Sequence, residues 1–337
     1  MRVIANFALI ISHWFSWYGP DGPMLYIFFY YFLGNLVHFT VVFFFIVSGY
    51  FIRHSLEAGK PAGAIVGRYA ARIFPIFVFW TLVYALEPGL GLRTLTAQGW
   101  APLIANLQNV SAAIRANPLL FLMTGNEIHL WFLPSLVFGC AWLALLTKLG
   151  KESWIAPLAV LGYAVYLITG PYYTALTGMQ RWQPEISRGF LTPIGCMSLG
   201  YWARQKNLRA TMRAALVMVL AGYALKLCER FLLFTLTGDP IRQAFMAGTP
   251  LMSLGLFFIA LNSPKILNLP VFARAASLTL GIYACHLIMD RKIHQFDLFH
   301  HGTWLEFFAP VAVYAATFAA VYALSLVPFV RRFVKNE

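Results

Sequence analysis

The sequence predicts an all-α, polytopic membrane protein of about ten transmembrane helices. Hydrophobic residues make up 60% of the 337 residues and charged residues only 11%, whereas soluble domains contain about 25% charged residues. A bilayer core about 30 Å thick requires about 20 apolar residues per helix, and windows of that length recur along the chain. Since no linker divides it, we expect a single membrane domain over residues 1–337.

The expected spans follow one another with short connections. Two further apolar segments, residues 24–32 and 109–123, can lie at the membrane interface or re-enter it, so a count of about twelve spans stays an alternative. The ten main spans cover residues 3–18, 35–52, 70–86, 130–149, 154–169, 190–201, 214–227, 245–261, 275–289 and 304–330.

Charge predicts the orientation of these spans. Most lysines and arginines fall on one set of alternate loops, which includes both chain ends, Lys148 and Lys206. Because positive loops stay in the cytoplasm, we expect both termini to be cytoplasmic. The loops expected outside surround Asp21, Arg93, Arg181, Asp239 and His300.

Two classes of partner are disfavoured by the same pattern. The net charge of +13 is spread over many short segments instead of one module, which argues against nucleic-acid binding. Metal binding is not indicated either, because the cysteines lack the close Cys/His spacing of a zinc site. We expect four buried thiols, at Cys140, Cys196, Cys228 and Cys285.

Ionisable residues inside spans are the first candidates for function, because a charge in the bilayer is expensive. Arg2 and His13 lie 11 residues apart on the first span, a separation that returns to nearly the same helix face. They can therefore line one channel. A packing role for His13 and a topology role for Arg2 are the alternatives.

Three further pairs have helical or local spacing. Arg68 and Arg72 lie four residues apart and can hold a phosphate-bearing ligand, although a topology signal would look the same. His286 and Asp290 have the spacing at which a carboxylate can orient an imidazole. The third pair, near the start of the fourth span, is Glu127 and His129.

Several motifs, taken in order, resemble the acyltransferase-3 family of integral membrane acyltransferases. Arg2 and His13 resemble its Arg-x10-His motif, and the run Phe43 to Tyr50 is similar to its Phe-Phe-x-x-Ser-Gly-Tyr stretch. Arg68 departs from the family spacing and is the weaker member of its pair. The other similar segments are Arg72 to Pro75, His129 to Leu133 and Gly281 to His286.

The resemblance implies transfer of an acyl group, usually acetyl from acetyl-CoA, to a hydroxyl of a surface or secreted carbohydrate such as a polysaccharide. We expect His13 to be the general base, with Ser48 or Tyr50 as oxyanion donor. Acyl-CoA phosphates would bind Arg2, Arg68 and Arg72, and no metal is expected. His286 and Asp290 are the second catalytic candidates, and the acceptor would contact Glu127, His129 and Trp131.

Other functions remain open at this point. His13 or Ser48 can instead carry the acyl group transiently across the membrane. A transporter or flippase for a glycan or lipid-linked substrate would also have ten spans and intramembrane histidines. A noncatalytic envelope-assembly subunit is a third possibility, and the sequence does not indicate an oligomeric state.

Overall fold

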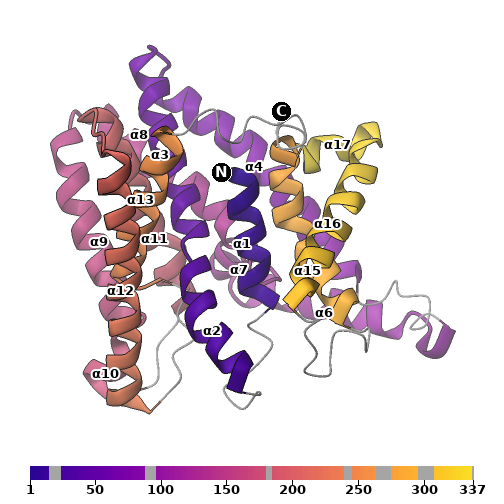
Figure 1. Ribbon diagram of the computed structural model, residues 1–337. Helices are drawn as coiled ribbons and strands as arrows, with labels where there is room; N and C mark the ends of the chain where they lie inside the picture. Colours follow the sequence, from indigo (N-terminus) through magenta and orange to yellow (C-terminus); the bar gives the residue numbers. More distant parts are fainter. Residues whose placement is uncertain are drawn as a thin grey trace.

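The computed structural model describes residues 1–14, 24–87, 96–179, 184–238, 245–262, 275–294 and 307–335. Every regular element within these ranges is a helix, and the long helices run side by side as a bundle (Figure 1). The prediction of an all-α, polytopic membrane protein is confirmed. The five loops expected on the outside, around Asp21, Arg93, Arg181, Asp239 and His300, lie outside the described residues.

The helices follow the chain with short connections. Their bounds are α1 Arg2–Trp14, α2 Met24–Val37, α3 Thr40–Glu57, α4 Ala62–Leu86, α6 Ala101–Ala116, α7 Pro118–Thr124, α8 Phe132–Lys148, the 3₁₀ turn η3 Glu152–Trp154, α9 Ile155–Thr169, α10 Tyr173–Thr177, α11 Pro184–Gln205, α12 Met212–Thr237, α13 Gly248–Asn262, α15 Thr279–His294, α16 Ala309–Ser325 and α17 Pro328–Val334.

Within the part of the chain that the structure describes, three helical segments are long and apolar enough to cross a membrane: Tyr31–Glu57, Ala62–Leu86 and Glu152–Thr169. Shorter apolar helices add Phe132–Lys148, Gly248–Asn262 and Ala309–Ser325. Large apolar side chains also face outward, as Leu220 and Phe231 do on α12. An exterior of this kind is solvated by lipid. The count of about ten spans stays a prediction.

Two helices are much longer than the sequence pattern indicates. The expected spans 190–201 and 214–227 belong to α11, with 22 residues, and α12, with 26. Hydropathy underestimates α12 because Lys226 and Arg230 lie within it, and both are buried inside the bundle. Residues 109–123 are divided between α6 and α7, since Asn117 caps α7 and Pro118 begins it.

One cysteine departs from the expected burial. Cys140, Cys196 and Cys285 are buried free thiols, but Cys228 is exposed. Cys228 follows the buried Lys226 by two positions on α12, and two positions turn a helix by about 200°. It therefore lies on the outward side, and the prediction of a buried thiol is wrong there.

Ion pairs gather at the two ends of the bundle. At one end, Arg53 pairs with Glu152 at 2.9 Å and Arg204 with Glu57 at 2.7 Å. At the other end, Arg291 pairs with Glu127 at 2.5 Å, and Lys292 with Glu87 at 2.8 Å. Charged groups favour water over hydrocarbon, so these two clusters mark the polar boundaries of the apolar bundle.

Glycine brings α3 and α11 into direct backbone contact. A Cβ at Gly49 would lie 1.8 Å from the carbonyl oxygen of Met197, and one at Gly200 would lie 1.8 Å from that of Ile46. Small residues allow such close approach between membrane helices. Because Ser48 precedes Gly49, this contact also fixes the position of Ser48.

We expect Gly49→Ala to lower the free energy of unfolding by about 1–3 kcal/mol or more, because the added methyl group must push backbone away. Gly63→Ala is the matched control, since a Cβ there meets nothing within 4 Å. It should leave stability unchanged or raise it by up to about 1 kcal/mol. Thermal unfolding of the purified variants measures both, and equal stability of the two would contradict the close contact.

Candidate active site

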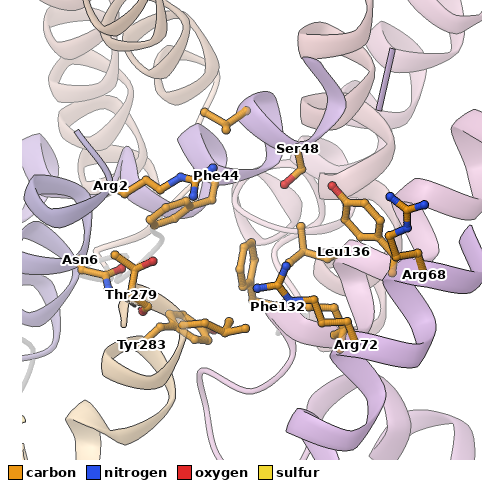
Figure 2. Close-up of a pocket in the computed structure, with 14 residues that line it drawn as sticks. Arg2, Asn6, Phe44, Ser48, Arg68, Arg72, Phe132, Leu136, Thr279 and Tyr283 are labelled. Atoms are coloured by element: carbon orange, nitrogen blue, oxygen red, sulfur yellow. Dashed lines mark hydrogen bonds between the residues drawn. The ribbon is translucent and has the colours of Figure 1, made fainter. Parts of the chain in front are cut away.

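The first cavity, called the arginine cavity here, lies where α1, α3, α4, α8 and α15 meet, and its volume is about 310 Å³. Figure 2 shows Arg2 on one side of it and Arg68 and Arg72 on the other. All three side chains are exposed, so solvent reaches the charged rim. The remaining lining residues are Asn6, Phe44, Val47, Ser48, Tyr69, Ile73, Phe132, Leu136, Thr279, Leu280 and Tyr283.

Local structure explains why these side chains meet. Arg68 and Arg72 are four residues apart on α4 and therefore share a face. Asn6 donates from Nδ2 to the carbonyl oxygen of Thr279 at 2.6 Å, which joins α1 to α15 beside Arg2. The sequence-predicted group of Arg2, Ser48, Arg68 and Arg72 is thus brought together at one cavity.

The second cavity, called the histidine cavity here, has a volume of about 210 Å³ and is lined by His13, near the end of α1 that lies away from Arg2. His129 and Trp131, assigned to the acceptor from the sequence, line it too. Arg2 and His13 therefore line two cavities rather than one channel, and Tyr283 lines both. The remaining lining residues are Leu9, Ser12, His38, Thr40, Val41, Ile128, Arg188 and Phe245.

Three imidazole rings form a row beside the histidine cavity. The ring centre of His286 lies 5.0 Å from that of His13 and 5.1 Å from that of His129. His286 Nδ1 lies 2.5 Å from the carbonyl oxygen of Tyr283, and His129 Nε2 lies 3.1 Å from that of Ala284. Carbonyl oxygens only accept hydrogen bonds, so we assign a proton to each of these ring nitrogens.

The opposite nitrogens of the same two rings are therefore basic lone pairs in the neutral imidazoles. His286 Nε2 and His129 Nδ1 are buried and have no hydrogen-bond partner among the described residues. When His13 takes up a proton, these basic ring nitrogens are therefore close to it. The hydroxyl of Tyr283 donates to the carbonyl oxygen of His129, which ties the row to the wall between the cavities.

Arg188 is a candidate that the sequence analysis did not single out. Its guanidinium carbon lies 4.8 Å from the centre of the Trp131 ring, and the side chain lines the histidine cavity. The expected span began at residue 190, which left Arg188 in a loop. The structure begins α11 at Pro184, so an arginine just before an apolar run was the signal that could have revealed it.

Four predicted site residues lie outside the lining of both cavities. Tyr50 does not line either cavity, and its hydroxyl accepts a hydrogen bond from Arg204 at 3.2 Å. Glu127 accepts one from Arg291 at 2.5 Å in the ion cluster beyond His129. Asp290 is fully buried one turn after His286 and lines neither cavity. His286 touches His13 without lining either cavity itself.

A comparison with known protein families indicates the general class of reaction, acyl transfer. A family model described as an acyltransferase domain matches residues 1–329, which is nearly the whole chain and includes both cavities. No curated protein and no solved structure matches the chain.

Proposed function

We propose a specific reaction for this chain, which belongs to the acyltransferase-3 family and is therefore a membrane acyltransferase. It transfers an acyl group, such as acetyl from acetyl-CoA, to a hydroxyl of a cell-envelope or secreted carbohydrate. One observation carries the proposal: a cavity with three guanidinium groups and a cavity with His13 adjoin at Tyr283.

The arginine cavity is the proposed site of the acyl-CoA. Guanidinium groups bind phosphate through forked, charge-assisted hydrogen bonds, and coenzyme A carries several phosphate oxygens. Arg2, Arg68 and Arg72 stand at the exposed rim, while Phe44, Phe132 and Tyr283 provide apolar lining further in. The phosphates therefore bind at the rim and the acyl thioester points toward Tyr283.

The histidine cavity is the proposed site of the reacting hydroxyl. His13 removes the hydroxyl proton while the oxygen attacks the thioester carbonyl carbon, and the C–S bond then breaks. The thiolate leaves as coenzyme A after taking up the proton, and the sugar keeps the acyl group as an ester. Arg188 donates to the oxyanion from the cavity that holds His13, and Ser48 donates from the donor side.

We favour direct transfer over a covalent relay. The two cavities adjoin at the Tyr283 side chain, so only this wall separates the proposed donor from the proposed acceptor. The family match also favours an enzyme over a transporter or flippase. Mass spectrometry of envelope glycans with and without the gene tests the acceptor class, and unchanged acyl esters on every glycan would contradict it.

The proposed orientation places both termini and the arginine cavity on the cytoplasmic side of a bacterial inner membrane. Acyl-CoA is made in the cytoplasm. In a Cys228→Ala background, a cysteine at Lys206 should react with an impermeant maleimide only after spheroplasts are opened. A cysteine at Thr177, which is exposed at the end of α10, should react in intact spheroplasts. The reverse pattern would place the arginine cavity outside.

Arg72→Ala should weaken acyl-CoA binding by about 1.5–3 kcal/mol, the range for a hydrogen bond to a charged group. Isothermal titration of the purified protein measures this. Arg213→Ala removes an exposed arginine near the start of α12, outside both cavities, and should bind acyl-CoA like the wild type. If a folded Arg72 variant binds acyl-CoA with unchanged affinity, Arg72 is a topology signal and not a ligand contact.

His13→Ala should lower turnover by about 100-fold to 10,000-fold, because that is the usual contribution of a general base. Acyl-CoA affinity and thermal stability should stay close to the wild type. His54→Ala is the control, since His54 is exposed near the end of α3. If His286→Ala abolishes turnover while His13→Ala does not, the base is His286. If both abolish it, rapid-quench trapping of an acyl-histidine tests the relay.

A further inference from the structure

A third cavity, called the asparagine cavity here, lies beside the histidine cavity and has no role in the mechanism above. Its volume is about 320 Å³, within the range of small-molecule sites. It is formed by the end of α4, by α6 and α7, and by the segment that follows α7. Its polar lining includes Tyr84, Asn106, Asn117, Thr124, Asn126 and Glu127.

Backbone contacts fix the orientation of three side-chain amides around this cavity. Asn106 donates from Nδ2 to the carbonyl oxygen of Ala85 at 2.7 Å, which leaves its Oδ1 as an acceptor. Asn126 donates to the carbonyl oxygen of Thr81 at 3.0 Å. Asn117 accepts from the amide of Leu120 at 3.0 Å and so retains Nδ2 as a donor. Fixed donors and acceptors in one cavity suit a ligand with several hydroxyl groups.

The oxygen of one of these amides has no hydrogen-bond donor among the described residues. Asn126 Oδ1 is buried and accepts no hydrogen bond from any described residue. A buried acceptor without a partner costs about 1–3 kcal/mol. Because Asn126 lines the cavity, a small shift of its side chain would bring this oxygen to a hydroxyl donor bound there.

The charge of the surroundings argues for a neutral ligand. Glu127 is the charged residue among the described residues that line the cavity, and its carboxylate already accepts from Arg291 at 2.5 Å. Glu87 balances the remaining cation of this cluster, since it pairs with Lys292 at 2.8 Å. Within the described part of the chain, the two carboxylates and two cations of this cluster compensate one another, so they offer no excess charge to an ionic ligand.

The chain connects this cavity to the catalytic histidines. Asn126 and Glu127 line the asparagine cavity, and Ile128 and His129 line the histidine cavity immediately after them. The ring centre of Tyr84 also lies 5.3 Å from that of His129. A ligand in the asparagine cavity is therefore close to one whose hydroxyl reacts at His13.

We propose that the asparagine cavity binds an uncharged sugar unit of the acceptor, next to the unit that receives the acyl group at His13. This inference rests on the proposed acyl transfer to carbohydrate. The acceptor then has a second subsite, which recognises a neutral sugar next to the unit that is acylated.

Saturation-transfer NMR on the protein in nanodiscs tests the site with glucose, galactose and N-acetylglucosamine, and with glucuronate as the charged comparison. At least one neutral sugar should bind, more tightly than glucuronate. Asn117→Asp keeps the oxygen that caps α7 and removes the Nδ2 donor, so it should weaken that binding about 3- to 10-fold. Asn126→Leu should weaken it similarly, and Gln108→Glu, an exposed control on α6 outside the cavity lining, should not.

Three results would overturn the site: no neutral sugar binds the wild type, both asparagine variants bind like the wild type, or glucuronate binds best. Acyl-CoA titration on the same samples separates this inference from the proposed function. Sugar binding without acyl-CoA binding contradicts the acyl-CoA reaction alone. Acyl-CoA binding with no loss of sugar binding in either asparagine variant contradicts the asparagine cavity alone.

Discussion

The position of α15 is the constraint on which the site depends. Its backbone accepts hydrogen bonds from three directions: Asn6 on α1 donates to Thr279, and both the Tyr84 hydroxyl and His129 bond to the Ala284 oxygen. In a membrane interior water cannot replace such bonds, so a polar group that loses its partner destabilises the bundle by more than it would on a wet surface. These bonds place Tyr283 and His286 of α15 against α1, which carries Arg2 and His13, and near α4, which carries Arg68 and Arg72.

The buried charges of α12 serve the bundle in a different way. Lys226 donates to the carbonyl oxygen of Asn35 at 3.3 Å, and the Arg230 guanidinium stacks on Tyr31 at 4.3 Å, so both hold α12 against α2. Glu229 accepts from the backbone amides of Ala247 and Gly248 at 3.0 and 2.9 Å, where α13 begins. A carboxylate is favourable at a helix N-terminus. The charged side chains of α12 therefore hold it against α2 and α13.

The sequence was sufficient for the fold class and for the shared face of Arg68 and Arg72, because both rest on local regularities, whereas the grouping of Arg2 with them followed from the family resemblance. Hydropathy defines the apolar helices, and the four-residue spacing of Arg68 and Arg72 fixes a shared face. Separating Arg2 from His13 required the tertiary structure, since only the packing of α15 puts Tyr283 between them. Arg188 and the Tyr50 contact with Arg204 were missed for the same reason, as both depend on where α11 begins and ends.

Tyr283 forms part of the wall of both the arginine and the histidine cavities, and this has a thermodynamic consequence. A ligand that shifts or immobilises the ring on one side changes the shape offered on the other side. The two occupancies are then linked, and linkage is reciprocal: whatever factor one ligand applies to the affinity of the second, the second applies to the first. Such an enzyme has no purely one-sided affinity constant, because each value holds only for a stated occupancy of the opposite cavity.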